Sequence, residues 1–480
     1  MDKRNWKIVY HSYEGLEKKA VELLCREMGA QILRDSGIYT LHVLPCEQAE
    51  VAVLDRHAVV IGLYDQNALF GRYIPREDVA EDGYVVEVMD NPDTPDAKLV
   101  LITAHQPSAL FYGAVDFVDD YFVWAAPKHD AVRLMDEVFA FPLPDYYHAS
   151  APSIKTRSAW TWGHPINDYR DYIQNMARLK LNQLIIWNDY VPLNAKDVVD
   201  YAHEYGISVI WGFAWGWSRH CDRIDLESLS SLAEDILKTY EEQYRDVGGD
   251  GIYFQSFTEL HTDKIGDKLI AETVTGFVNT VSGKLLQTYP DLHIQFGLHA
   301  SSVKDHLEHI ARVDERVEIM WEDCGTFPYG YFPYDIDKAA FDNTLSFVDR
   351  VLTLRENGDV SLLFKGFLTL DWHGNRFVHQ AGPYVLGENA KSIIRHDREL
   401  VKPMWRQLQG DWMQNGEYAY TAARRVASHG NPDVAVGLVG QFAGGIWFPE
   451  ALCAEMLWNC DRSYAELVNT VAKRRCVEMT

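Results

Sequence analysis

Short runs of apolar residues alternate with longer amphipathic stretches from residue 155 onward. The short runs, bounded by turn residues, predict buried strands, and the stretches with helical periodicity predict helices. Strands are predicted at 156–160, 183–187, 208–213, 251–257, 293–298, 317–321, 363–370 and 434–441, and helices at 166–179, 194–205, 226–245, 263–288, 303–312, 337–357 and 386–428. Such alternation is typical of parallel βα units.

The number and order of these units predict the fold class. We predict an α/β protein in which a (β/α)8 TIM barrel occupies residues 155–447 and closing helices occupy residues 448–480. A doubly wound open sheet is the alternative, but no glycine-rich phosphate loop follows the first strand to favour it.

Residues 1–126 show a different pattern, which predicts a small α+β domain ahead of the barrel. The expected elements are a strand at 5–12, a helix at 14–28, short strands at 52–54, 58–61, 84–88 and 99–103, and a helix at 107–121. The proline-rich passage at 127–154 predicts an extended linker.

The charge of the chain argues against several classes of partner. The 480 residues carry a formal net charge of −25, which disfavours binding to nucleic acid or to an anionic membrane surface. No run approaches the ~20 apolar residues of a membrane helix, and the first residues show no signal-peptide pattern. The seven cysteines are scattered, as expected of free thiols in a reducing compartment. A cytoplasmic protein is therefore expected.

Aromatic and polar residues gather just beyond the predicted strands, where barrel enzymes carry their active sites. Taken strand by strand, they are Trp162 and His164, Trp187 and Asp189, Trp215 and Trp217, Glu259 and His261, His299, then Trp321, Glu322 and Asp323, then Asp371, Trp372 and His373, and finally Trp447. Sugar rings stack on aromatic side chains and exchange hydrogen bonds with carboxylates and imidazoles. The pattern therefore predicts a carbohydrate substrate.

Cleavage of a glycosidic bond needs one carboxylic acid and a second carboxylate that acts as base or nucleophile. The candidates are Glu259, Asp371, Glu322 and Asp323. Glu322 and Asp323 are adjacent, so in an extended backbone only one of them can face the site. No HxH or HExxH pair occurs near the strand ends, and neither a metal nor another cofactor is predicted.

Three segments carry a resemblance to known families. The run Leu110–Phe117, the barrel opening Lys155–Arg157 and the stretch at 175–182 make the chain similar to the microbial α-glucuronidases and the β-N-acetylhexosaminidases. Both families join an N-terminal domain of this kind to a catalytic barrel, so the resemblance implies the same arrangement here.

The two families imply roles for particular residues. In the α-glucuronidases the acid is a glutamate just beyond strand four, which implies that role for Glu259. Their later carboxylates correspond to Glu322 or Asp323 after strand six and to Asp371 after strand seven. The hexosaminidases bind sugar hydroxyls through an arginine on strand one, matched here by Arg157. Their adjacent Asp-Glu pair is not matched, because Thr258 precedes Glu259.

We therefore predict an exo-acting glycoside hydrolase for a short oligosaccharide or glycoside, α-glucuronidase-like and inverting, with Glu259 as acid and Asp371, Glu322 or Asp323 as base. One alternative is a hexosaminidase-like enzyme that uses the N-acetyl group of its substrate, with Asp323 or Asp371 orienting that group. Another is a sugar-binding barrel without catalytic activity. The barrel helices and the C-terminal helices offer surfaces for a homodimer.

Overall fold

The chain separates into two compact units in the computed structural model. The first comprises Met1–Pro152 with Glu204–Gly206 and Ala472–Cys476, and the second comprises Ser153–His203, Ile207–Val471 and Val477–Thr480. The structure describes residues 6–36, 42–45, 57–95, 97–122, 144–161, 166–188, 190–216, 226–325, 329–330, 335–356, 359–365, 382–429, 435–439 and 442–480.

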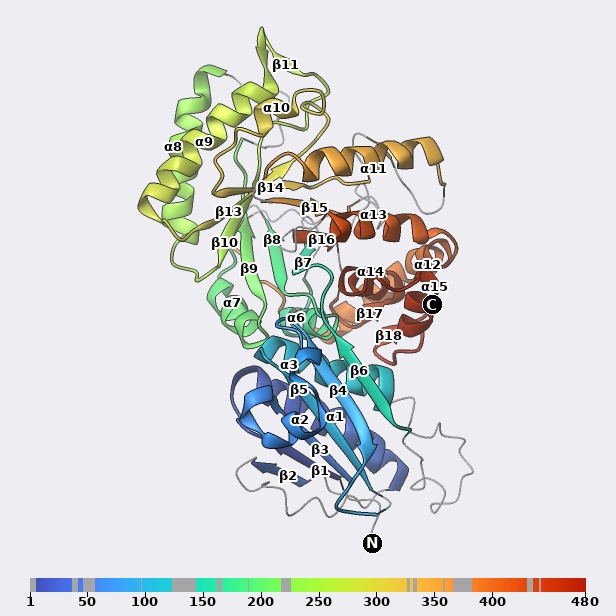
Figure 1. Cartoon of the computed structure of the whole chain (residues 1–480). Helices are drawn as coiled ribbons and strands as arrows, with labels where there is room; N and C mark the ends of the chain where they lie inside the picture. Colours follow the sequence, from blue (N-terminus) through green and yellow to red (C-terminus); the bar gives the residue numbers. More distant parts are fainter. Residues whose placement is uncertain are drawn as a thin grey trace. The chain divides into compact units, whose positions relative to one another are not determined.

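The first unit is built on a six-stranded mixed sheet of order β2-β1-β3-β5-β4-β6 (Figure 1). Strands β1, β2, β3 and β5 run parallel, whereas β4 pairs antiparallel with β5 and with β6. The bounds are β1 Trp6–Tyr10, β2 His42–Pro45, β3 His57–Leu63, β4 Tyr84–Asp90, β5 Lys98–Ala104 and β6 Tyr146–Ser150.

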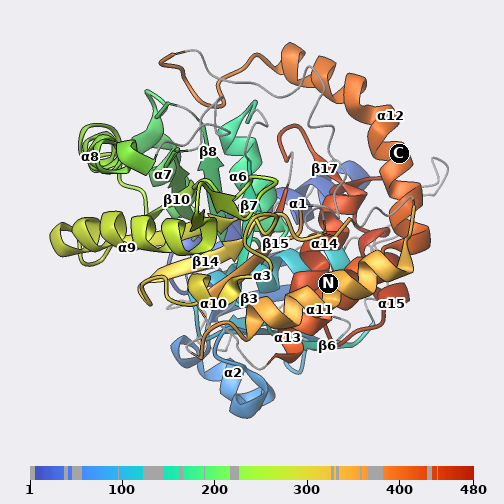
Figure 2. The same cartoon turned by 90° about the horizontal axis from the view of Figure 1, so that it is seen from above.

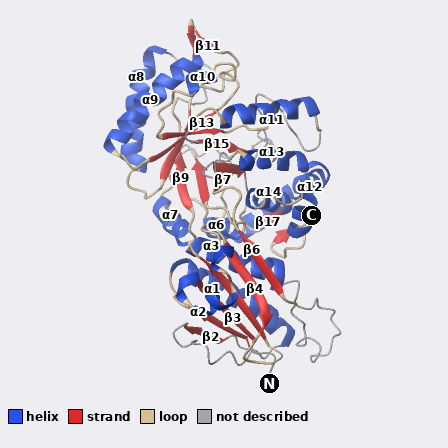
Figure 3. Ribbon diagram, viewed as in Figure 1, coloured by secondary structure: helices blue, strands red, loops and turns tan. Residues whose placement is uncertain are grey.

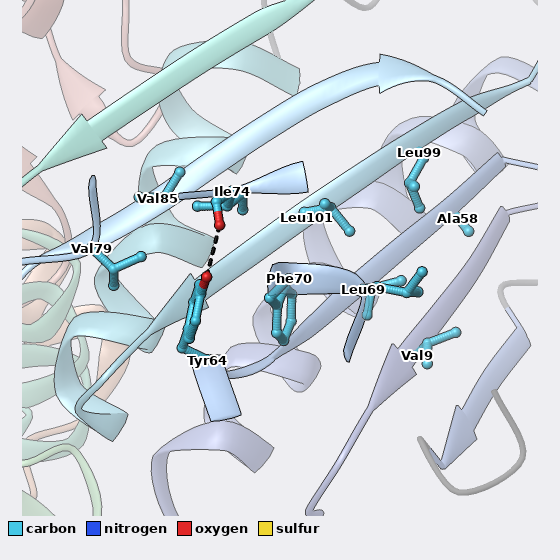
Figure 4. Packing of buried hydrophobic residues seen from close by; sticks show 11 residues of the cluster. Val9, Ala58, Tyr64, Leu69, Phe70, Ile74, Val79, Val85, Leu99 and Leu101 are labelled. Carbon is cyan, nitrogen blue, oxygen red and sulfur yellow. Dashed lines mark hydrogen bonds between the residues drawn. The ribbon is translucent and has the colours of Figure 1, made fainter. Parts of the chain in front are cut away.

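Helices cover both faces of this sheet. Helices α1 (Gly15–Ser36) and α3 (Pro107–Asp116) pack against each other and against the strands. On the other face, α2 (Ala68–Tyr73) contributes Leu69 and Phe70 to a buried cluster with alternate residues of β3 and β5 (Figure 4). The alternation of side chains along a strand explains why one strand serves both layers.

Strand β6 lies inside the passage at 127–154 that was predicted to be an extended linker. Residues Tyr146–Ser150 pair with β4 instead and form the edge of the sheet. The prediction of an extended backbone holds for these residues, but the prediction that they only connect two domains is wrong. Residues 123–143 lie outside the described part of the chain.

The second unit contains parallel strands that pair in the cyclic order β7-β8-β9-β10-β13-β14-β15-β16, with β16 pairing back onto β7. The shortest register joins β15 to β16 through two residue pairs. The predicted α/β class is confirmed. The bounds are β7 Thr156–Trp160, β8 Gln183–Trp187, β9 Ser208–Gly212, β10 Gly251–Gln255, β13 His293–Leu298, β14 Val317–Trp321, β15 Val360–Leu363 and β16 Ala435–Val439.

Each connection between neighbouring strands of this unit contains at least one helix (Figure 3). Seen from above, α8, α9, α11 and α12 lie outside the strands (Figure 2). The bounds are α6 Tyr169–Arg178, α7 Ala195–Glu204, α8 Leu229–Thr239, α9 Ile270–Thr288, α10 Leu307–Ile310, α11 Lys338–Leu352, α12 Lys391–Asn415, α13 Glu417–Ser428, α14 Phe448–Trp458 and α15 Tyr464–Val471. Two-residue pairs join β11 (Lys264–Ile265) to β12 (Lys268–Leu269) and β17 (Ile446–Trp447) to β18 (Val477–Glu478).

An apolar cluster fills the interior of the strand ring. It draws Trp160, Ile185, Trp187, Ile210, Tyr253, Met320 and Leu363 from six different strands. Tyr253 meets the ring of Trp187 edge to face, with 5.5 Å between centroids. Because these side chains come from strands on several sides of the ring, they fill its interior as a packed apolar core.

A single side chain determines where α11 begins. Oδ1 of Asp337 accepts hydrogen bonds from the amides of Ala339 and Ala340 at 2.9 and 3.2 Å. We expect Asp337→Ala to lower the free energy of unfolding by about 1 kcal/mol, since two amides lose their cap. Asp342→Ala removes only an exposed ion pair with Lys338. It should lower the free energy of unfolding by only a few tenths of a kcal/mol. Equal losses in urea unfolding would contradict a capping role.

None of the helices in the described part of the chain is long and apolar enough to cross a bilayer.

Candidate active site

Four neighbouring strands, β10, β13, β14 and β15, carry polar side chains at or just beyond their carboxyl ends. On β14, Met320 belongs to the interior cluster, and Glu322 follows it by the two-residue period of a strand. Gln255, His299 and Lys365 take the corresponding places on the other three strands. Because the carboxyl ends of parallel strands meet at one edge, these side chains gather there.

His299 is the centre of this group. Its side chain is 3% exposed, and Nδ1 lies 3.1 Å from Oδ2 of Asp323. Nε2 contacts Oε1 of Glu322 as an ion pair that is off the line of a hydrogen bond, and it lies 3.8 Å from Oε2 of Glu259. Burial alone would lower the pKa of His299, but the charges of Glu322 and Asp323 raise this pKa to about 10.

Glu322 is fully buried, and both of its oxygens face donors. Oε2 accepts hydrogen bonds from the hydroxyl of Tyr253 and from Nε2 of Gln255. Oε1 faces His299 and lies 3.6 Å from the ammonium of Lys365. Burial would raise the pKa of Glu322, but the charges of His299 and Lys365 outweigh it and lower the pKa to about 2. These contacts therefore stabilise the anionic form of Glu322.

Asp323 also reaches His299, although it is the neighbour of Glu322 in sequence. The expectation that only one of the two could face the site is wrong, because β14 ends at Trp321 and residues 322–325 form a turn. Burial raises the pKa of Asp323, while the hydrogen bond with His299 acts in the opposite direction. Within the described part of the chain, Oδ1 of Asp323 has no hydrogen-bond partner.

Glu259 is the carboxylate of this group that solvent reaches, with 40% of its side chain exposed. It follows the turn that ends β10. That turn is held in place because Oγ1 of Thr258 accepts a hydrogen bond from the amide of His299 at 3.1 Å. The hydroxyl of Ser302 donates to the carbonyl oxygens of Thr258 and Leu260, at 2.5 and 2.6 Å. Glu259 thus sits on a fixed loop at the rim.

The site depends on the absence of a side chain at Gly297. A Cβ there would lie 2.5 Å from Cζ of Tyr253 and 2.8 Å from Oε2 of Glu322. We expect Gly297→Ala to separate these two groups and to lower the free energy of unfolding by about 1–3 kcal/mol through overpacking. Gly276→Ala in α9, where the added methyl group meets open space, should be neutral or stabilising. Urea unfolding of both variants checks this, and equal stabilities would contradict it.

The four predicted sugar-binding tryptophans that the structure describes, Trp187, Trp215, Trp321 and Trp447, are all at most 2% exposed. Three of them pack against other buried aromatic side chains. Trp215 stacks on Phe254, Trp321 meets Phe347 edge to face, and Trp447 stacks on Trp405. Trp187 belongs to the apolar core inside the strand ring. In this structure their role is packing, so their assignment as sugar platforms is corrected.

Two further predicted residues do not join the group. Arg157 is buried near the start of β7, where its guanidinium donates to the carbonyl oxygens of Ile154, Lys155 and Lys180. The start of a parallel strand is the end opposite the site, so Arg157 stabilises backbone there and its assignment to substrate binding is corrected. His261 is exposed on the segment that follows Glu259.

The remaining predicted residues lie outside the described part of the chain. They are Trp162, His164, Asp189, Trp217, Asp371, Trp372 and His373. Among the residues that the structure describes, no group of three or more His, Cys, Asp and Glu side chains could hold a metal ion.

Three members of the site were missed as functional residues: Tyr253, Gln255 and Lys365. Tyr253 and Gln255 stand two apart on β10, a spacing that puts both side chains on the same face. The predicted strand at 363–370 placed Lys365 inside a strand, whereas β15 ends at Leu363 and Lys365 lies in the turn beyond it. The sequence signal for Tyr253 and Gln255 was the two-residue spacing of their polar groups in an otherwise apolar strand.

Comparison with known proteins gives a likeness of fold. No protein-family model matches the chain, and no curated protein matches it. The structure of CpGH84B has a TM-score of 0.52 at 11% identity, over 97% of this chain and 70% of that one. That likeness shows a shared fold, that of a glycoside hydrolase structure.

Two other solved structures are more distant. The structure of CpGH84D has a TM-score of 0.42 at 14% identity, over 72% of this chain and 55% of that one. A GH138 enzyme targeting pectin rhamnogalacturonan II has a TM-score of 0.49 at 10% identity, over 96% of this chain and 52% of that one. This chain therefore spans only about half the length of each of these two.

Proposed function

We propose that this chain is a glycoside hydrolase whose strand ring is a (β/α)8 barrel, with its active site at the carboxyl ends of β10, β13 and β14. The observation that carries the proposal is the convergence of Glu259, Glu322 and Asp323 on one buried imidazole, that of His299. A glycosidase needs two carboxyl groups on either side of the bond that it breaks. The likeness of fold to CpGH84B agrees with this class.

Glu259 is the proton donor in this proposal. A general acid has to touch the leaving oxygen of the substrate, and Glu259 is the carboxyl group of the cluster that solvent reaches. Its loop is held by Thr258 and Ser302, so the carboxyl group has a defined place at the rim. The resemblance to the α-glucuronidases favours the same residue.

Asp323 is the second catalytic carboxylate in this proposal. Glu322 has donors on both oxygens and a pKa lowered to about 2 by His299 and Lys365 against the effect of burial, which makes it a weak base. Asp323 has a raised pKa because it is buried, and its Oδ1 has no hydrogen-bond partner in the described part of the chain. Asp371, the other predicted base, lies outside the described residues.

The proposed course of the reaction is inversion, as the resemblance to the α-glucuronidases implies. Glu259 and Asp323 contact different nitrogens of the same imidazole ring, at 3.8 and 3.1 Å. An inverting enzyme keeps its two carboxyl groups roughly 6.5–9.5 Å apart, which leaves room for an attacking water. Asp323 would activate that water, while Glu259 protonates the leaving oxygen.

The test is a screen of the purified chain against aryl α- and β-glycosides, including glucuronides and N-acetylhexosaminides. We expect hydrolysis of one class. On the phenyl glycoside of that class, hydrolysis should be lost in Glu259→Gln and kept in Glu234→Gln, a variant at an exposed glutamate of α8. Proton NMR of the first product formed should show the anomer opposite to that of the substrate. Hydrolysis of the phenyl glycoside that survives Glu259→Gln, or no hydrolysis of any glycoside, would contradict the proposal.

A further inference from the structure

His299 has no ring nitrogen left for a substrate. Nδ1 faces Asp323 at 3.1 Å, and Nε2 faces Glu322 and Glu259. A neutral imidazole donates from one nitrogen and accepts at the other. A neutral ring would point a lone pair at one of the carboxyl groups, whereas the imidazolium carries a proton on both nitrogens and attracts the carboxylates at each of them.

The imidazolium faces three carboxyl groups and is the counter-charge for Glu322 and Asp323. The charged and titratable groups around it come from three strand ends: Tyr253 and Glu259 from β10 and its loop, Glu322 and Asp323 after β14, and Lys365 after β15. Lys365 pairs with Glu322 at 3.6 Å. His299 is therefore the cation that contacts Glu259 and Asp323 together.

We propose that His299 is a positioning residue that holds Glu259 and Asp323 on opposite nitrogens of one imidazolium and keeps Asp323, the base, ionised in the resting site. This replaces the earlier prediction that His299 binds the substrate, and it rests on the proposed hydrolase function. Without the cation, repulsion between Glu322 and Asp323 would favour protonation of Asp323. The raised pKa of His299, about 10 because Glu322 and Asp323 outweigh burial, agrees with this role.

The charge of His299 can be measured without any substrate. In protein labelled with 15N at histidine, the signal missing from His299→Gln identifies the ring of His299. We expect this ring to stay an imidazolium, with both nitrogens protonated, from pH 6 to pH 9. A ring that is neutral at pH 7.5 would overturn the inference, whether or not the chain hydrolyses a glycoside.

The kinetic test compares the histidine that begins β13 with the histidine that directly follows it. His293 lies at the start of β13 and pairs with Glu318 of β14 at 2.8 Å, as His299 pairs with Glu322 at the other end. We expect His299→Gln to lower kcat with little change in KM and to move the acidic limb of the pH profile of kcat/KM upward. The shift should be about 1 pH unit or more, since an opposite charge at this range changes a carboxyl pKa by about 1–3. His293→Gln should leave the profile unchanged.

The outcomes separate this inference from the proposed function. A raised KM with unchanged kcat in His299→Gln would restore the substrate-binding role, and a lowered kcat with an unmoved acidic limb would leave His299 a packing role only. Both results overturn the inference while the hydrolase assignment stands. Hydrolysis of a phenyl glycoside that persists in Glu259→Gln would instead overturn the proposed function.

Discussion

Glu322→Gln should destabilise the folded chain more than any other conservative substitution at the site. The carboxylate is fully buried and faces Tyr253, Gln255, His299 and Lys365. Removal of one partner from a buried ion pair typically costs about 3–5 kcal/mol, because the remaining charge stays buried without its counter-charge. We expect a loss at the lower end of this range, since glutamine keeps the shape. Urea unfolding at pH 7 measures it.

The same variant should lose a specific dependence on pH. The pKa of Glu322 is lowered from 4.5 to about 2 because His299 and Lys365 outweigh burial. A lowered carboxyl pKa contributes stability above the unfolded value, and this contribution is lost as the pH falls from 4.5 towards 2. The free energy of unfolding of the natural chain should therefore fall more steeply in acid than that of Glu322→Gln. Equal stability of the two at pH 7 would contradict the described ion pairs, and Glu234→Gln is the exposed control.

Glu259→Gln should show the opposite combination of effects. The side chain is 40% exposed and 3.8 Å from His299, so its change to glutamine should alter the free energy of unfolding by no more than about 0.5 kcal/mol. Loss of a general acid typically lowers the rate by about 10²–10⁴-fold, and we expect a decrease of this size in kcat/KM for the phenyl glycoside. A loss of activity matched by a loss of stability would indicate a structural residue.

Several strand positions could be predicted because their apolar runs end abruptly. The predicted bounds at 156–160, 183–187, 293–298 and 317–321 agree with β7, β8, β13 and β14. The prediction at 363–370 is wrong at its start, because β15 runs Val360–Leu363. Apolar residues continue past Leu363 as Phe364, Phe367 and Leu368, so the pattern gave no signal for the end of the strand.

The two-residue period of a strand predicts which side chains at the strand ends face the site. Met320 and Glu322 share the inward face of β14, which leaves Trp321 to pack outward against Phe347 of α11. The tryptophans were instead taken together as one rim, and that prediction failed because neighbouring positions of a strand face opposite sides. The approach of Asp323 to His299 depends on a turn geometry that spacing alone does not specify.

The measurement that tests the central claim most directly is the effect of the leaving group on hydrolysis by Glu259→Gln. A dinitrophenolate departs without a proton, whereas a phenolate needs one, so only the phenyl glycoside depends strongly on a general acid. With the sugar found in the screen, we predict that Glu259→Gln loses most of its kcat/KM on the phenyl glycoside and keeps most of it on the dinitrophenyl glycoside. Equal losses on both substrates, or no loss on either, would contradict the assignment of Glu259 as proton donor and the active site built around it.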